Sequence, residues 1–358
     1  MVPAERSPRY TEYVKRTLAT RIPVILKTAE EGQAAEAIRQ LHAIARAVEA
    51  DGPMVLDHAS WPLPGWEALP GRVNGKRPSD ASFFDFEYWL YFRILKAVHY
   101  PEARNDPFRA IKHRDLERHI DWAEQAIQKT QTLAEALSLS LDANAHDLSQ
   151  LSGPASNHML GRELLQIEPS GIKRINIIAD NFGAEFVADL VLATIAAEAG
   201  IEVVVHVKHL PIFVSDVTTD DVIILFDRLK PGTSFGRRLQ AEVDRGTVRV
   251  TSNTFWAAPQ FLDQMPLEEL ETGEGVLNVL KGDLNFRRAI GDAVVAIQTP
   301  FEQLPVLPAA PLLALRSIKS YCVAGMRIWP AGMSSEDFPK DGSIVAVQQI
   351  PAKATVSA

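Results

Sequence analysis

Polar residues follow two apolar stretches of the sequence, at places where buried strands would end. Asp180 and Asn181 follow the run RINIIA, and Asp216 follows the run IFVS. Ligands of open parallel sheets bind outside the carboxyl ends of the strands, and carboxylate and amide oxygens suit magnesium or manganese. The three residues are therefore candidate metal ligands. Both patterns also fit a purely structural role, because Asp and Asn cap helices at strand-to-helix turns.

A second group of residues could bind an anion. The stretch KGDLNFRR (281–288) follows an apolar run, and its cations suit a phosphate group. Charge at a buried strand end needs a partner, whereas Arg288 alone could lie on a solvated face. Arg316 and Lys319 are three residues apart and could face one direction, although most such pairs are surface charges. After Gly183, a helix N-terminus is expected to add a further anion site.

Composition excludes several classes of protein. The 358 residues carry a net charge of −8 and contain no basic block, so we expect no nucleic-acid partner. The single cysteine, Cys322, rules out a disulfide within the chain and a cysteine-based zinc site. Apolar segments are interrupted before they reach the length of a membrane span, and the first residues lack the apolar core of a signal peptide. We therefore expect a cytoplasmic protein without a membrane partner; the sequence makes no prediction of oligomeric state.

Hydrophobic periodicity changes part-way along the chain. Apolar residues at helical spacing predict helices over 11–31, 30–51, 82–100 and 114–141. Short β-branched runs then predict strands over 174–180, 202–207, 221–226 and 247–253, with later strands over 275–282, 319–326 and 343–350. Strands alternating with helices indicate an α/β fold with a mostly parallel sheet. We place a helical N-terminal subdomain at 1–165 and the α/β core at 166–358.

Other catalytic motifs are absent from the sequence. No GxxxxGK[ST] phosphate loop and no GxSxG nucleophile elbow occur. The Asp-x-Asp nucleophile of aspartyl-phosphate phosphatases is also missing, since Asp180 is followed by Asn181 and Phe182.

The motifs together resemble one family, the damage-control phosphatases, formerly domain of unknown function 89. The resemblance is to its sugar-phosphate branch, some members of which were also described as acidic-residue methyltransferases. It extends over nearly the whole chain, from the helical segments FEYWLYFRIL and LDANAHDLS to ADNFGAEFVADLVLA, FVSDVTTDD, SNTFWAAPQFLDQMP, KGDLNFRRAIGD and RSIK. Three departures are Leu141–Ala143 for the usual Leu-Trp-Gly, Phe286 for Tyr, and Ser320–Tyr321 for Ala-Asp. Two of them adjoin segments expected to touch the substrate, so sugar specificity could differ.

The resemblance implies a helical N-terminal part packed on a three-layer α/β/α core. It implies a divalent ion (Mn²⁺, Ni²⁺, Co²⁺ or Mg²⁺) held by Asp180, Asn181 and Asp216. We also predict that the helical half forms a wall of the site, because Glu87, Arg93, Asn144 and Asp147 are polar residues in strongly apolar segments and need partners or a ligand. The residues assigned to a small phosphorylated substrate are Asn144, Asp147, Lys281, Asp283, Asn285, Arg287, Arg316 and Lys319. The catalytic candidates are Asp180, Asp283 and Glu87, with Asp283 and Glu87 as alternatives for orienting water or protonating the leaving oxygen.

The resulting prediction is a metal-dependent phosphatase that acts on small phosphate esters, such as fructose or other hexose phosphates, in metabolite damage control. One alternative is S-adenosylmethionine-dependent carboxyl methylation, although the turn ADNFGAEF has one glycine where that cofactor usually meets a glycine-rich loop. The other is a non-catalytic sugar-phosphate-binding protein, which could lose the metal ligands. The presence of Asp180, Asn181 and Asp216 together argues against it.

Overall fold

The protein divides into two compact units. The computed structural model describes residues 8–144, 158–229, 232–266, 270, 272–326 and 339–353. One unit combines Met1–Arg114 with Leu210–Val214 and Ala257–Gln260, and the other contains Asp115–His209, Ser215–Trp256 and Phe261–Ala358. The division of the chain at 165/166 stays a prediction.

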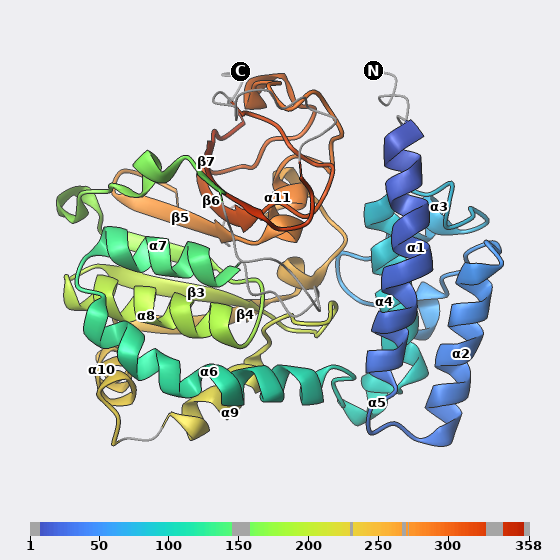
Figure 1. The fold of residues 1–358 in the computed structure, drawn as a ribbon, viewed down its shortest axis with the longest axis horizontal. Helices are drawn as coiled ribbons and strands as arrows, with labels where there is room; N and C mark the ends of the chain where they lie inside the picture. Colours follow the sequence, from blue (N-terminus) through green and yellow to red (C-terminus); the bar gives the residue numbers. More distant parts are fainter. Residues whose placement is uncertain are drawn as a thin grey trace. The chain divides into compact units, whose positions relative to one another are not determined.

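The first unit is helical, as its periodicity predicts (Figure 1). Ser82 caps the buried helix α4, since its side chain accepts a hydrogen bond from the Asp85 backbone N–H. Aromatic rings surround this helix, and Trp66 packs edge-on against Tyr88. The helices are α1 (Pro8–Ala29), α2 (Ala35–Glu49), α3 (Leu69–Val73), α4 (Phe83–Ala97) and α5 (Tyr100–Ala103).

The single helix predicted over 114–141 is wrong, because the chain forms two helices there. They are α6 (Arg109–Lys129) and α7 (Leu133–Ala143). Thr132 begins α7 with a capping box: its side chain accepts from the Glu135 N–H, and the Glu135 carboxylate accepts from the Thr132 N–H. The two reciprocal bonds satisfy free backbone donors of a new helix start, so the chain turns between Thr130 and Thr132.

The described part of the second unit contains a seven-stranded sheet of order β1-β7-β6-β5-β2-β3-β4. All neighbouring strands are parallel except β6 and β7. The predicted α/β class with a mostly parallel sheet is therefore confirmed. The strands are β1 (His158–Leu160), β2 (Arg174–Ile178), β3 (Glu202–Lys208), β4 (Val248–Asn253), β5 (Val276–Lys281), β6 (Leu312–Ser317) and β7 (Ile344–Ile350).

Helices cover both faces of this sheet. Ile177 and Val279 point into a core shared with α6, α7, α8 (Ala184–Glu198) and α10 (Ser234–Asp244). Their neighbours Ile178 and Leu280 point into a second core with Phe286 of α11 (Asp283–Ala289). Alternate residues of a strand face opposite sides, so two separate cores make this unit three-layered. Figure 1 shows α7 and α8 lying over one face of the sheet.

Two predicted strands are wrong. Residues 221–226 lie in helix α9 (Thr219–Arg228), which begins with a capping box between Thr218 and Asp221. Residues 319–326 form no strand; the preceding run Leu312–Ser317 is β6, which is paired with β5 on one side and β7 on the other. Short apolar runs fit strands and buried helices alike. Helix caps and strand-pairing partners therefore determine which of the two forms. Within the described ranges, no helix is long and apolar enough to cross a membrane.

His206, in the centre of β3, should make stability depend on pH. Its ring is 4% exposed and lies 5.6 Å from the Trp256 ring, centroid to centroid. Burial, assisted by Arg174, lowers the pKa of His206 from 6.5 to about 4. The unfolded chain therefore binds a proton between these values that the folded chain does not. Stability is retained above pH 6.5, and about 3 kcal/mol should be lost as the pH falls towards 4.

Urea unfolding of the wild type and of His206→Gln from pH 7.5 to 4 would measure this contribution. The stability difference between the two proteins should change by about 3 kcal/mol over that range. The same comparison with His42→Gln, at an exposed histidine of the first unit, should show a much smaller change. Parallel pH profiles for the wild type and His206→Gln would contradict the assignment.

Candidate functional site

Two loops meet at the carboxyl ends of β2 and β3. Asn181 pairs with Asp216 in an isolated antiparallel bridge, and the Val217 N–H donates to the Asp180 carbonyl at 3.1 Å. These backbone bonds bring all three predicted metal ligands together. Lys208, the last residue of β3, lies between the two carboxylates, with its Nζ 3.0 Å from Asp180 Oδ1 and 2.5 Å from Asp216 Oδ1.

The cluster formed by Asp180, Asn181, Asp216 and Lys208 is buried; none of its members is more than 7% exposed. Burial lowers the pKa of Lys208, but the Asp216 and Asp180 carboxylates outweigh burial, so the net pKa is above its ordinary value. Lys208 is therefore an ammonium ion at neutral pH. Asn181 accepts from Ser215 Oγ through Oδ1 at 2.6 Å and donates through Nδ2 to Asp180 Oδ2 at 3.1 Å.

A second buried network adjoins this cluster. Asn181 Nδ2 also donates to Glu185 Oε2 at 2.9 Å, and Asn144 Nδ2 donates to Glu185 Oε1 at 2.8 Å. Lys281 lies 3.5 Å from Glu185 Oε1 and 2.9 Å from Asp189 Oδ1. Burial raises the pKa of Glu185 to about 7: Lys281 opposes the shift, while the Asp180 and Asp189 carboxylates add to it.

Lys281 is fully buried within this second network. Its ammonium donates to the carbonyl and the Oγ of Ser140 at 2.5 and 2.6 Å, in addition to its two carboxylate partners. Ser140 Oγ in turn donates to Asp189 Oδ1 at 2.6 Å. Lys281 thus ties β5 to α7 and α8. Its predicted contact with a substrate phosphate stays a prediction.

The residues after β5 form two ion pairs. Asp283 Oδ1 lies 2.7 Å from Arg316 Nη1, and Arg287 Nε lies 2.7 Å from Asp292 Oδ1. Arg316 is fully buried, with its guanidinium carbon 3.3 Å from the centre of the Phe286 ring. These pairs hold Asp283 and both arginines in defined positions near the end of β5.

One backbone donor at the N-terminus of α8 is bonded within the protein. The Ala184 N–H donates to Asp115 Oδ2 at 3.1 Å, so a carboxylate of α6 occupies the place expected for an anion. Gly183 permits this approach, because a Cβ on its backbone would lie 1.9 Å from the same oxygen. The expectation that this helix end contributes to phosphate binding stays a prediction, and the Asp115 carboxylate beside it would repel an anion.

The comparisons with known proteins identify the family of this chain. The family model of the damage-control phosphatase ARMT1-like domain matches residues 3–328. The chain belongs to this family. Damage-control phosphatase ARMT1 of Macaca fascicularis is 30% identical over 222 residues, which cover 58% of this chain and 49% of that protein. The Mus musculus protein of the same name is 31% identical over 170 residues, or 44% of this chain and 38% of that protein.

The chain spans about half the length of the curated relatives it matches. Among solved structures, a DUF89 family protein from Pyrococcus horikoshii has a TM-score of 0.48 at 15% identity, covering 86% of this chain and 91% of that one.

Some of the predicted site residues lie in or next to the buried cluster, and others lie outside it. Asp180, Asn181 and Asp216 share the buried cluster, and Lys281 and Asn144 join it through Glu185. The remaining assignments are more dispersed. Asn285 donates to the Lys281 carbonyl at 2.9 Å, and Lys319 is half-buried. Glu87 belongs to the helical unit. Asp147 lies outside the described residues.

Sequence reasoning missed four members of the two networks: Lys208, Glu185, Asp189 and Ser140. Lys208 ends the apolar run EVVVHV in the same way that Lys281 ends VLNVL. Applying the same argument to both strand ends would have found it, because buried charge needs a partner. Ser140 carries no such signal, since serine is common on helices. Only the contact with Lys281 in the structure identifies Ser140 as a member of the network.

The donor set suits a hard divalent cation. The Asp180 and Asp216 carboxylates both contact one ammonium, so their oxygens can share one cation. The Asn181 amide lies beside them, with Nδ2 towards Asp180 and Oδ1 towards Ser215. In the part of the chain that the structure describes, no group of three or more His, Cys, Asp or Glu side chains is arranged for a metal. The third predicted ligand, Asn181, is an amide and so is not a residue of these four types.

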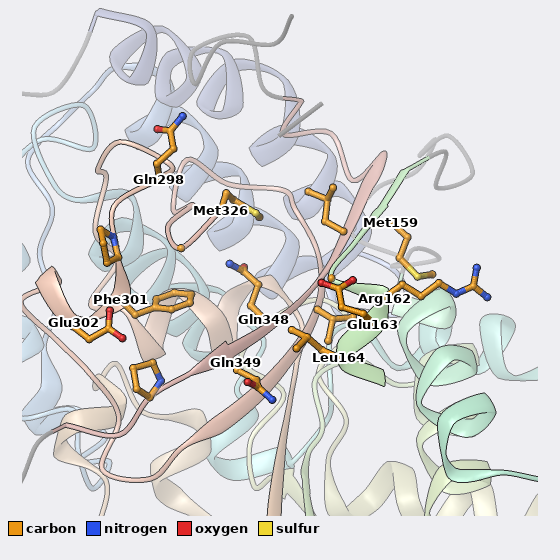
Figure 2. Close-up of a pocket in the computed structure, with 16 residues that line it drawn as sticks. Met159, Arg162, Glu163, Leu164, Gln298, Phe301, Glu302, Met326, Gln348 and Gln349 are labelled. Atoms are coloured by element: carbon orange, nitrogen blue, oxygen red, sulfur yellow. The ribbon is translucent and has the colours of Figure 1, made fainter. Parts of the chain in front are cut away.

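A cavity of about 540 Å³ lies elsewhere in the second unit, and none of the predicted site residues lines it. Figure 2 shows Phe301 and Glu302 on one side of it and Met159 and Leu164 on the other. One lining residue, Gln348, accepts from Arg316 Nη2 at 3.4 Å. The cavity wall therefore contacts the partner of Asp283 but not the buried cluster.

Gly282 sets the position of Asp180. Its φ is +83°, and an added Cβ would lie 1.9 Å from Asp180 Oδ2. Gly282→Ala should displace that carboxylate and lower kcat/KM for a phosphate ester by about a hundredfold, as expected for a misplacement of about 1 Å.

Gly200→Ala is the matched control for Gly282→Ala. Gly200 has the same φ of +83°, but an added Cβ would meet nothing within 4 Å. Gly200→Ala should lose about 1 kcal/mol of stability in urea unfolding because alanine disfavours positive φ, and Gly282→Ala should lose more because its Cβ also clashes with Asp180. Only Gly282→Ala should lose activity; equal kinetics for the two variants would show that Asp180 tolerates displacement.

Proposed function

We propose that this protein is a metal-dependent phosphatase that hydrolyses phosphate monoesters of small metabolites, with hexose phosphates such as fructose phosphates as the first candidates. The observation that carries the proposal is the buried cluster of Asp180, Asn181 and Asp216 at the carboxyl edge of a parallel sheet. Family membership supports it, because the relatives are named damage-control phosphatases.

Asp180, Asn181 and Asp216 would hold the divalent cation, for which Mn²⁺, Ni²⁺, Co²⁺ and Mg²⁺ are candidates. When bound, such an ion supplies a Lewis acid for the phosphoryl oxygens. The protein supplies the rest. Its backbone bridge fixes the carboxylates, and its Asn181 amide is held by Ser215 and Glu185, so the donors are positioned before substrate arrives.

Asp283 is the better placed of the two acid–base candidates. It directly follows Gly282, which packs against Asp180, and Arg316 holds its carboxylate at 2.7 Å. Asp283 could orient the attacking water or protonate the leaving oxygen. Glu87 remains the alternative from α4 of the helical unit. For the substrate phosphate, Arg287 and Lys319 are the cations we propose.

Methyl transfer has less support as a function. The turn after β2 contains Gly183 but no glycine-rich loop, and its helix N-terminus is capped by Asp115. A cofactor carboxylate would meet that like charge. The non-catalytic alternative is also disfavoured, because a protein that only binds sugar phosphate has no need to bury two carboxylates and an amide together.

Metal removal tests the proposed function directly. Hydrolysis of p-nitrophenyl phosphate should disappear after treatment with EDTA and return on addition of Mn²⁺, Co²⁺, Ni²⁺ or Mg²⁺. A panel of hexose phosphates, followed by release of inorganic phosphate, would then rank substrates. Full activity after exhaustive chelation would refute the metal dependence. Phosphate release from no ester, combined with binding of a sugar phosphate, would favour the non-catalytic alternative.

A further inference from the structure

Lys208 occupies a position that the metal-site hypothesis does not explain. It is 2% exposed and its ammonium contacts both Asp180 and Asp216, the two carboxylates proposed to hold a divalent cation. A positive charge this close to the ligands opposes the entry of another cation. A site built only for tight metal binding would contain a neutral residue here.

The backbone keeps Lys208 in place. Its N–H donates to the Val217 carbonyl at 3.0 Å, and the residue pairs with Thr218 in an isolated parallel bridge. Its Cα is therefore anchored to the same loop that carries Asp216. The ammonium lies 3.4 Å from the Asp180 carbonyl oxygen in addition to the two carboxylates. These three partners of the ammonium are all oxygens of proposed ligand residues.

Formal charges suggest what this arrangement achieves. Two carboxylates and one ammonium carry one net negative charge, which a divalent cation would reverse to one net positive charge. Without Lys208, the same ion would only neutralise the site. A positive site attracts a phosphate group, and a neutral one attracts it less.

We propose that Lys208 is a built-in counter-ion of this site, which weakens metal binding and strengthens binding of the substrate phosphate. The inference rests on the proposed function and adds a residue that the resemblance did not assign. It predicts effects of opposite sign on two ligands. A residue that merely held the loops together would, when replaced, weaken the binding of both.

The test uses Lys208→Gln, which removes the charge but keeps a hydrogen-bond donor. Isothermal titration calorimetry should show that Mn²⁺ binds the metal-free variant about tenfold or more tightly than it binds the wild type. With Mn²⁺ saturating, inorganic phosphate should bind the variant about tenfold or more weakly. Lys173→Gln, at an exposed lysine next to β2, is the matched control and should change neither affinity.

Thermal unfolding across a range of Mn²⁺ concentrations extends the test to a variant that is unstable without metal. Lys208→Gln should reach its maximal Tm at a lower Mn²⁺ concentration than the wild type. Lys208→Arg keeps the positive charge and should not bind Mn²⁺ more tightly. Weaker Mn²⁺ binding by Lys208→Gln, unchanged affinities, or failure to fold at every Mn²⁺ concentration would overturn the inference.

Mn²⁺ binding and ester hydrolysis by the wild type distinguish an error in this inference from an error in the proposed function. If the wild type binds Mn²⁺ and hydrolyses p-nitrophenyl phosphate while Lys208→Gln binds both ligands as the wild type does, only the role of Lys208 is wrong. If the wild type neither binds Mn²⁺ nor hydrolyses the ester, both proposals are wrong.

Discussion

Asp180→Asn should lower kcat for hydrolysis of a phosphate ester by about a thousandfold or more. The substitution removes one of two carboxylates in the buried cluster and replaces it with an amide of nearly the same shape. Asp180 Oδ1 accepts from Lys208 and Oδ2 accepts from Asn181. Loss of its charge therefore weakens both the proposed metal site and the pairing of Lys208. The size of the amide makes a large change in fold unexpected.

Steady-state kinetics with saturating Mn²⁺ and p-nitrophenyl phosphate would measure this effect. Asp216→Asn should be similarly inactive, and the double variant little worse, because residues that act as a unit are not additive. Asp121→Asn, at an exposed aspartate of α6, is the control and should retain full activity. Wild-type kcat in Asp180→Asn would remove the cluster from the catalytic site.

Lys281→Met should lower the free energy of unfolding by about 3–5 kcal/mol. The fully buried ammonium of Lys281 lies between Glu185 and Asp189, and it also bonds twice to Ser140. Removing it leaves two buried carboxylates facing each other without a cation. Methionine fills a similar volume, so the loss should come from charge rather than from a cavity.

Urea unfolding of Lys281→Met and of Lys173→Met, at an exposed lysine, would measure the difference. The exposed control should lose less than about 0.5 kcal/mol. Adding Asp189→Asn to Lys281→Met should recover part of the stability, since one uncompensated charge is removed. Wild-type stability in Lys281→Met together with a raised KM for phosphate esters would instead support the phosphate contact predicted from the sequence.

Secondary structure followed from the sequence where the hydrophobic period was long and regular. Helices α1, α2 and α4 and strands β2, β3 and β5 lie where the pattern predicts them. The errors fell on segments whose local pattern was ambiguous. The run 221–226 suits a strand or a helix equally, and the capping box at Thr218 decided for a helix. Thr132 divided a continuous helical pattern for the same reason.

The sequence by itself determined that Asp180, Asn181 and Asp216 follow apolar runs, and parallel strands necessarily bring such ends to one edge of a sheet. Only the tertiary structure decided which charges pair there. Lys208 and Lys281 look alike in the sequence, yet one faces the proposed ligands and the other is sealed between α7 and α8. Pairing depends on side chains far apart in the chain, and burial makes each choice of partner energetically decisive.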